Sequence, residues 1–175
     1  MFSILYTMIS NYDLEDMAHF YKIDIVVVMK DELIKIKPIS GNYIINLESS
    51  KDGNGTHWMG LKIENFDCVY FDSYGYLPPQ EIISFCKRIH NSHLAYNTKE
   101  IQNLSTTTCG FYALAFLLFL HFKKKIIPDL FSRSSAFSNL FYDNTKYNNK
   151  NLQLFYRELP NSSHLQILRR LYNQK

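Results

Sequence analysis

The sequence predicts a fold that contains both helices and strands, and three observations lead to this prediction. An apolar run from Phe111 to Leu120 has the length and composition of a buried helix. The stretches His57–Glu64 and Cys68–Asp72 read as strands, and the pair Asn65-Phe66 between them reads as a tight turn. The chain is therefore expected to combine a pair of adjacent strands with a buried helix.

The other elements follow from shorter patterns. Leu14, Met17 and Phe20 recur at helical spacing, so Tyr12–Tyr21 is expected to be an amphipathic helix capped by Asn11 or Asp13. We further expect a buried strand at Ile23–Met29, strands at Asn42–Leu47 and Leu94–Asn97, a turn-rich loop at Ser49–Gly55, and helices at Pro78–Ile89, Leu152–Leu159 and Leu165–Tyr172. Residues 127–142 are mixed, and no linker indicates a second domain, so residues 1–175 are expected to form one domain.

The composition excludes several classes of protein. The chain has 175 residues with 46% hydrophobic and 15% aromatic content, which is typical of a globular protein. The net charge of +3 permits contact with an anionic polymer without requiring it. The apolar run is shorter than the roughly 20 residues that span a membrane, so we expect no membrane contact. An odd cysteine count and an N-terminus without a basic region favour a reducing compartment.

Cys109 is the first candidate for chemistry. A polar loop, Asn103–Thr108, runs directly into Cys109-Gly110 and the apolar helix. With hydroxyl caps expected among Ser105 to Thr108, the thiol lies on the first helical turn. There it faces unpaired backbone N–H groups and the positive end of the helix dipole, and both favour the thiolate. The alternative is a core helix with a buried, inert cysteine.

His57 and Asp72 are expected to meet across two strands. If Asn65-Phe66 is a two-residue loop that pairs Glu64 with Asp67, His57 lies across from Tyr74 and one diagonal step from Asp72. Such diagonal neighbours are about 7 Å apart at the backbone, so imidazole and carboxylate are able to hydrogen-bond. That bond fixes the tautomer of a catalytic histidine. The alternatives are a strand-end histidine and a turn carboxylate, and a one-residue slip of the register removes the pairing.

A thiol nucleophile also needs a base and oxyanion donors. His57 is the expected base, and the Cys109 backbone N–H and the Gln102 side-chain amide are the expected donors, although Gln102 also reads as an ordinary loop amide. His121 lies roughly 18 Å along the helix from Cys109, too far to be the base. His90 and His93 are weak as a metal pair, so no metal site is expected.

The order of these residues along the chain resembles that of adenain, the adenovirus maturation protease. The matching residues are His57-Trp58, Asp72 before Ser73-Tyr74-Gly75, Gln102, and Cys109-Gly110. That family belongs with the SUMO-specific proteases of the Ulp1 type. The similarity is greatest to the adenain-like proteases of virophages and Maverick/Polinton elements, whose pattern resembles VVVMKDEL, GNYIINLE, GTHWMGL and VYFDSYG here. It covers roughly Leu14 to Leu120, and the part after about residue 125 carries no matching motif.

The resemblance implies an α+β fold, in which a mixed central sheet packs against a buried helix that carries the nucleophile. It also implies a role for each matched residue: Cys109 as nucleophile, His57 as general base, Asp72 as orienting acid, Gln102 as oxyanion donor, and Trp58 and Gly110 as substrate-binding residues. Adenain has Glu where this chain has Asp72, and either carboxylate orients a histidine.

The resemblance implies a cysteine endopeptidase that cleaves viral capsid or core precursors. The enzyme is expected to be located in the virion and in the reducing interior of the host cell. We expect it to be a monomer. Adenain is stimulated by DNA and by a viral peptide linked through a cysteine. Neither Cys68 nor Cys86 falls just before Gln102, where adenain carries that cysteine, so we expect no required cofactor and at most weak stimulation by DNA or a viral peptide. The rivals are a ubiquitin-like-modifier protease or acetyltransferase of the same fold, and a catalytically inactive binding or scaffold protein.

Overall fold

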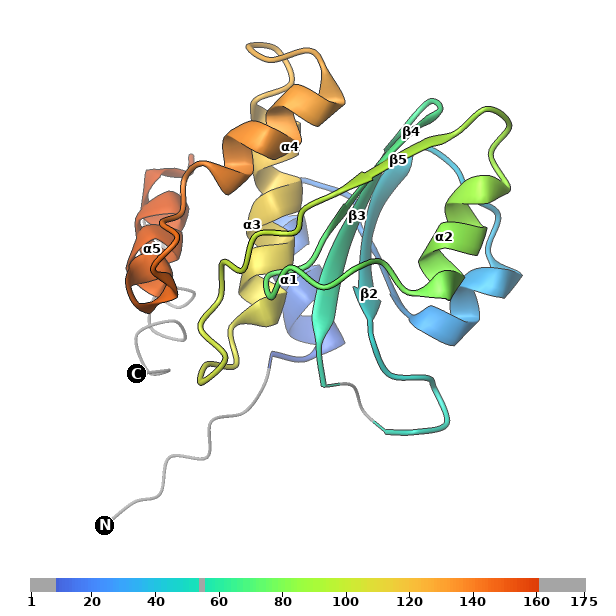
Figure 1. Cartoon of the computed structure of the whole chain (residues 1–175), viewed down its shortest axis with the longest axis horizontal. Helices are drawn as coiled ribbons and strands as arrows, with labels where there is room; N and C mark the ends of the chain where they lie inside the picture. The colour runs from blue at the N-terminus through green and yellow to red at the C-terminus, as the bar shows by residue number, and fades with distance from the viewer. Residues whose placement is uncertain (1–8, 54–55, 161–175) are drawn as a thin grey trace.

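The computed structural model describes residues 9–53 and 56–160, and a five-stranded mixed sheet forms its centre (Figure 1). The strands lie side by side in chain order: β1 (Val26–Met29), β2 (Gly41–Asn46), β3 (Trp58–Glu64), β4 (Asp67–Phe71) and β5 (His93–Tyr96). The outer pairs β1–β2 and β4–β5 are parallel, and the inner pairs β2–β3 and β3–β4 are antiparallel. The predicted α+β fold with a mixed sheet is confirmed.

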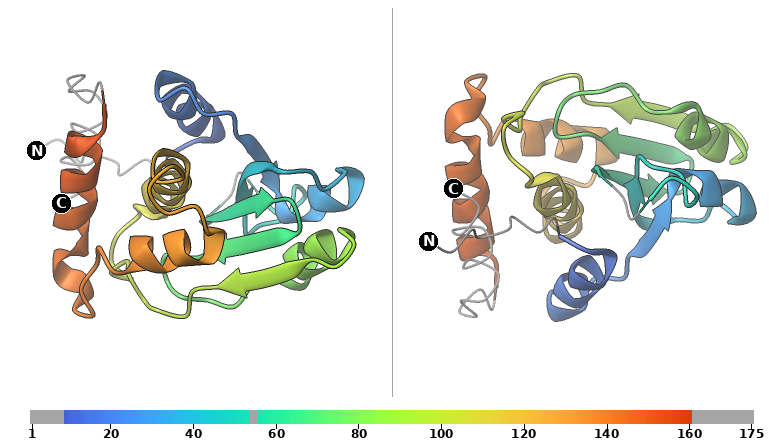
Figure 2. Two further views of the ribbon diagram at one scale, coloured as in Figure 1. Left: turned by 90° about the horizontal axis from the view of Figure 1, so that it is seen from above. Right: turned by 90° about the horizontal axis from the view of Figure 1, so that it is seen from below.

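Helices cover both faces of the sheet (Figures 1 and 2). One face carries α3 (Cys109–Phe122), flanked by α1 (Asn11–Phe20) and α4 (Leu130–Ser138). The other face carries α2 (Gln80–Lys87) and the short 3-10 helix η1 (Lys30–Lys35). The 3-10 turn η2 (Thr145–Tyr147) leads into α5 (Asn148–Glu158), which packs against α3 outside the layers that touch the sheet. Each face of the sheet has its own hydrophobic core.

The α3 helix is buried on every side, as its apolar run predicts. All twelve residues from Cys109 to Leu120 are buried, the pattern of a helix enclosed by other elements. Its Phe116 ring stacks on Phe71 of β4, with centroids 4.8 Å apart. The helix that carries Cys109 is therefore fixed directly to the strand that leads to Asp72.

The β3–β4 hairpin has the predicted register. Glu64 pairs with Asp67 and Gly60 pairs with Phe71, and Asn65 in the turn takes the positive φ of 56° that Asn tolerates better than most residues. The ladder extrapolates past the strand ends to His57 and Tyr74, whose rings are stacked. The pairing inferred from the turn is confirmed.

Two predictions about the first elements are wrong. β1 begins at Val26 rather than Ile23, and it is a half-exposed edge strand rather than a buried one. Its β-branched run looks buried because the local sequence does not encode the order of strands in the sheet. The cap of α1 is Ser10, not Asn11 or Asp13; the Ser10 hydroxyl accepts from the Asp13 N–H, and the Asp13 carboxylate bonds back to the Ser10 N–H.

Element boundaries also differ in the later part of the chain. The α2 helix begins at Gln80, two residues after the predicted start at Pro78, and α5 begins at Asn148, before the predicted Leu152. The η1 turn was not predicted. The predicted helix at Leu165–Tyr172 lies outside the described residues, as does part of the Ser49–Gly55 loop. Among the described helices, none has the length and apolar character to cross a membrane.

Candidate active site

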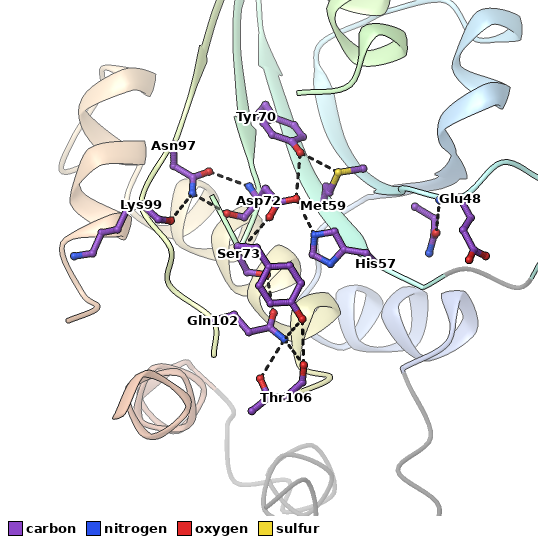
Figure 3. A network of polar contacts seen from close by, with 12 residues as sticks. Glu48, His57, Met59, Tyr70, Asp72, Ser73, Asn97, Lys99, Gln102 and Thr106 are labelled. Atoms are coloured by element: carbon purple, nitrogen blue, oxygen red, sulfur yellow. Dashed lines mark hydrogen bonds and ion pairs between the residues drawn. The ribbon is translucent and has the colours of Figure 1, made fainter. Parts of the chain in front are cut away.

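His57 and Asp72 form a short hydrogen bond where β3 begins and β4 ends (Figure 3). The distance from His57 Nε2 to Asp72 Oδ2 is 2.7 Å, and the two side chains are only 7% and 1% exposed. Because a carboxylate accepts and does not donate, the proton on this bond belongs to Nε2. The tautomer of a neutral His57 is thereby fixed, and Nδ1 is left with a lone pair.

Three further groups hold Asp72. Its Oδ1 accepts from the backbone N–H of Tyr74 at 2.7 Å, and its Oδ2 also lies 3.3 Å from the Tyr70 hydroxyl. Asn97, just beyond β5, accepts from the Asp72 N–H at 2.9 Å and donates to the Asp72 carbonyl at 2.7 Å. The carboxylate facing His57 is therefore fixed through both its side chain and its backbone.

Cys109 lies on the other side of the imidazole. Burial lowers the pKa of His57, but hydrogen bonding to Asp72 and to Cys109, together with their negative charges, outweighs burial and raises that pKa to about 9. Nδ1 is buried and makes no regular hydrogen bond among the described residues, so the contact with the Cys109 sulfur is a loose one. Loose contacts of this kind are common in unliganded active sites and tighten when substrate binds.

Gln102 is buried in a polar cluster in front of α3 (Figure 3). Its Oε1 accepts from the Ser73 hydroxyl at 2.7 Å. Its Nε2 donates to the Thr106 carbonyl at 2.8 Å and lies 3.1 Å from the Tyr74 hydroxyl and 3.2 Å from the Thr106 hydroxyl. Gln102 thus joins the loop that follows β4 to the loop that leads into Cys109.

The loop after β4 is a tight turn. The Gly75 N–H donates to the Asp72 carbonyl at 3.0 Å, and Gly75 has a φ of +75°. A Cβ there would lie 2.7 Å from the Thr98 carbonyl oxygen, so only glycine fits both the conformation and the space. The turn brings Tyr74 back over His57, where the two rings stack with centroids 4.8 Å apart and planes 23° apart.

The predicted hydroxyl capping of α3 is wrong. Thr108 occupies the N-cap position, but no side chain caps the helix there. The Thr108 hydroxyl instead donates to Asn149 Oδ1 at 3.1 Å, and Tyr112 donates to the same oxygen at 3.0 Å. The first-turn N–H groups beside Cys109 therefore have no side-chain cap, which leaves them suited to receive an anionic oxygen.

Trp58 and Gly110 pack together beside Cys109. The Trp58 indole N–H donates to the Ile9 carbonyl at 3.0 Å, and the side chain is 5% exposed. A Cβ on Gly110 would collide with the Ile9 side chain and lie 3.1 Å from the Trp58 ring. The glycine is thus required for α3 to approach this corner. Substrate contact by Trp58 or Gly110 stays a prediction, and both have a packing role in this structure.

The other cysteines and histidines lie elsewhere. Cys68 and Cys86 are both buried in the core beneath α2, and a hydrogen bond to Cys68, together with burial, raises the pKa of Cys86. His93 is on the surface, 3.1 Å from Asp67, and His121 is exposed at the far end of α3. Within residues 9–53 and 56–160, no group of histidine, cysteine or acidic side chains is arranged to hold a metal ion.

Several supporting residues were not identified from the sequence. The predicted hairpin register places Tyr74 across from His57 but indicates no role for it in the site, and Asn97 and Asn149 carry no signal in the sequence. A third Asn, Asn148, donates to the Ile101 carbonyl at 2.9 Å and so fixes the residue before Gln102. These polar side chains act across distances of many residues in sequence, and no local pattern marks them.

The chain has an α+β fold of the Ulp1-like type, which solved protease structures share. In particular, it is similar to the crystal structure of the ASFV pS273R protease, with a TM-score of 0.52 and 13% identity over 85% of this chain. The selenomethionine form of that protease gives a TM-score of 0.52 and 14% identity. The match spans 65% and 66% of those two chains, so this chain covers somewhat less than two thirds of that protease. No family model and no curated protein matches the sequence.

Proposed function

We propose that the protein is a cysteine endopeptidase that uses a Cys109–His57–Asp72 triad. The observation that carries this proposal is the buried 2.7 Å bond from His57 Nε2 to Asp72, which directs the lone pair of Nδ1 away from the carboxylate. Cys109, which influences the pKa of this imidazole, is the nucleophile. The fold shared with a viral protease supports the same assignment.

The first half of the reaction begins with the Cys109 proton on His57 Nδ1. The thiolate attacks the carbonyl carbon of the scissile peptide bond and forms a tetrahedral oxyanion. The oxyanion is stabilised by the Cys109 backbone N–H and by Gln102 Nε2, once this amide exchanges its bond to Thr106 for one to substrate. His57 then gives its proton to the leaving amine, the C–N bond breaks, and a thioester remains on Cys109.

The second half hydrolyses the thioester. His57, now neutral, takes a proton from water through Nδ1 as the resulting hydroxide attacks the acyl carbon. The C–S bond breaks, the carboxylic acid product leaves, and the Cys109 thiolate is restored beside imidazolium. Asp72 stays ionised throughout, holds the Nε2–H and stabilises the imidazolium in each half.

We further propose that the substrates are flexible segments of viral capsid or core precursors, cleaved after a small residue in the host cell and the virion, as in the adenain-like proteases of virophages and Maverick/Polinton elements. Cleavage of a modifier fusion requires a broad surface for a folded ubiquitin-like domain. The described residues before β2 are instead occupied by α1, β1 and η1, which pack on the sheet and on the other helices. The enzyme is proposed to act as a monomer without metal or a required activator.

The test compares two substrates at equal concentration: candidate capsid precursors of the same genome, and ubiquitin or SUMO fusions. We expect cleavage of the capsid precursor, abolished by Cys109→Ala and retained by the control Cys86→Ala. Mass mapping of the products gives the cleavage site. A modifier fusion with a kcat/KM more than about tenfold higher, a difference of roughly 1.4 kcal/mol in the transition state, rejects the maturation role. Cleavage that survives Cys109→Ala rejects the nucleophile.

The proposed independence from an activator has its own test. The free cysteines other than Cys109 are Cys68 and Cys86, and both are buried, so neither offers an accessible partner for a disulfide-linked peptide. Activity is expected to be the same with and without reductant when a cysteine-containing viral peptide is added. Added DNA is expected to change activity weakly, with an effect that disappears as salt is raised. Activation by the peptide that reductant reverses contradicts the proposal.

A further inference from the structure

The first turn of α3 is held from the side by Asn149, the second residue of α5. Asn149 Oδ1 accepts from the Thr108 hydroxyl at 3.1 Å and from the Tyr112 hydroxyl at 3.0 Å. Both donors are buried, and they lie one helical turn apart on either side of Cys109. Burial raises the pKa of the Tyr112 hydroxyl, which therefore stays a neutral donor. One oxygen of α5 thus receives two hydroxyls that flank the nucleophile.

Thr108 does not have the backbone conformation of an ordinary capping residue. Its φ of −95° and ψ of 10° lie in the bridge region, whereas a capping residue is usually extended. Ser10, which caps α1, shows the ordinary case in the same chain: its ψ is 167°, and its hydroxyl accepts from the Asp13 N–H at 3.2 Å. Thr108 thus occupies the N-cap position of α3 while its hydroxyl is directed to α5.

The conformation of Thr108 sets the direction of the Cys109 N–H. The peptide unit between these two residues is planar, so the ψ of Thr108 orients the whole unit. A change of that ψ from 10° to the 167° found at Ser10 would rotate the unit, and the N–H with it, by most of a half-turn. In the proposed mechanism this N–H stabilises the oxyanion together with Gln102. The bond to Asn149 therefore bears on the aim of an oxyanion donor.

Removing the Asn149 side chain gives the Thr108 hydroxyl a competing use. Of the two contacts that the structure gives this hydroxyl, only the 3.2 Å contact with the Thr106 hydroxyl remains. Capping of an uncapped helix by threonine is favourable, and it requires the extended backbone. The α5 helix itself stays docked, because the buried Tyr156 hydroxyl donates to the Phe111 carbonyl at 2.7 Å. The loss of Asn149 is thus expected to act on Thr108 rather than on the position of α5.

We infer that Asn149 is a positioning residue of this site. By accepting from Thr108 and Tyr112, it keeps Thr108 out of the capping conformation and keeps the Cys109 N–H directed at the substrate carbonyl. This role rests on the proposed function, because it acts through an oxyanion donor. The defect of an Asn149 variant should therefore run through the Thr108 hydroxyl, and removal of that hydroxyl should rescue it. A purely structural role of Asn149 in docking α5 predicts no rescue.

The experiment is a double-mutant cycle on wild type, Asn149→Ala, Thr108→Val and the variant that carries both changes. Valine has nearly the shape of threonine but no hydroxyl, so it cannot cap α3. Asn151→Ala is the matched control, because Asn151 is another asparagine of α5 and donates instead to the Leu140 carbonyl at 3.0 Å. The measured quantities are kcat and KM with a capsid-derived peptide, the rate of Cys109 alkylation by iodoacetamide at neutral pH, and the melting temperature.

For Asn149→Ala we expect kcat to fall by about 10- to 100-fold with little change in KM, because an oxyanion donor is misdirected. Alkylation should slow by about two- to fivefold, since the new cap takes up N–H groups that favour the thiolate. Thr108→Val should lower kcat by less than about threefold, and the double variant should match Thr108→Val in both rates within about threefold. Asn151→Ala should keep both wild-type rates. Asn149→Leu, which fills similar space, replaces Asn149→Ala throughout if that variant does not fold.

A double variant that is as slow as Asn149→Ala, or slower, overturns the inference, as does an Asn149→Ala protein with the wild-type kcat. A low melting temperature together with an unrescued kcat assigns Asn149 to the docking of α5 instead. These outcomes are distinct from failure of the proposed function. If the wild type cleaves no capsid peptide, the peptidase assignment fails, and the alkylation rates of the same cycle still decide whether Asn149 acts through Thr108.

Discussion

Asn97 and Asp72 hydrogen-bond to each other twice, once in each direction. The Asp72 N–H donates to Asn97 Oδ1 at 2.9 Å, and Asn97 Nδ2 donates to the Asp72 carbonyl at 2.7 Å. The same amide nitrogen lies 3.2 Å from the Lys99 carbonyl. Since these contacts use only the backbone of Asp72, they hold residue 72 in place whatever its side chain is.

Asp72→Asn is therefore expected to lower turnover steeply in a protein that still folds. An amide at this position favours the wrong imidazole tautomer, so kcat should fall by about 1,000-fold or more. The melting temperature should stay close to that of the wild type. The matched control is Asp67→Asn, because Asp67 and His93 form a similar pair on the surface, with side chains 38% and 72% exposed. Near-normal turnover in Asp72→Asn means that another group orients His57.

Cys109 is expected to be the thiol that reacts first. Limited iodoacetamide at neutral pH, followed by peptide mass mapping, should find Cys109 modified before Cys68 or Cys86. Cys86 is buried in the core and hydrogen-bonded to Cys68, and both effects raise its pKa and keep it as the thiol. Labelling of Cys86 ahead of Cys109 contradicts the assignment of the nucleophile.

The raised pKa of His57 predicts a stability contribution with a defined pH window. Because the folded-state pKa of about 9 exceeds the ordinary value of 6.5, folding favours the protonated imidazole. The contribution is complete below about pH 6.5 and is lost as the pH rises through about 9. The free-energy difference of unfolding between wild type and His57→Gln should shrink across this window. A difference that grows with pH has the wrong sign for this site.

Gln102→Ala should lower kcat by about 100- to 1,000-fold with little change in KM, the loss expected for one oxyanion donor. Ser73→Ala is the control, since it removes the partner of Oε1 and leaves the donors on Nε2 untouched. The fall in kcat for Ser73→Ala should stay below about tenfold. A Gln102→Ala defect that appears only in KM assigns this side chain to substrate binding or to the loop at Thr106.

Arg133 provides a prediction about stability alone. Its side chain is fully buried and donates to the Leu120 carbonyl at 2.8 Å and to Glu64 at 2.7 Å, which joins α4 to the end of α3 and to β3. Arg133→Met should lower the free energy of unfolding by about 1–3 kcal/mol without changing kcat. Lys124→Met removes a 62% exposed cation from the same Glu64 and should cost less than about 1 kcal/mol. An equal loss of unfolding free energy in the two variants contradicts the conclusion that the buried Arg133 stabilises the fold more than the exposed Lys124.

The parts of this structure that the sequence predicts are those set by short-range patterns. The β3–β4 register follows from a two-residue turn, and with it the approach of His57 to Asp72. The buried helix follows from an unbroken apolar run. In both cases the residues that decide the structure are neighbours in the chain or on adjacent strands.

The parts that were missed depend on which elements meet in space. Hydroxyl groups among Ser105 to Thr108 were expected to cap α3, but the hydroxyl of Thr108 at the N-cap position donates to Asn149, a residue 41 positions later. The run in β1 looks like a buried strand, and only the strand order makes it an edge. Asn97 and Tyr74 gain their roles from a turn and a strand that approach each other in the fold. No pattern within a short window of sequence contains that information.

The dependence of the Cys109 loop on α5 has a consequence for the newly made protein. Asn148 holds Ile101, and Asn149 holds Thr108 and Tyr112, so both ends of the Gln102–Thr108 segment are fastened by residues synthesised 37 to 47 positions later. The thiol emerges from the ribosome before its surroundings exist. The hydrogen bonds that fasten this segment can therefore form only after residues 148 and 149 have been synthesised.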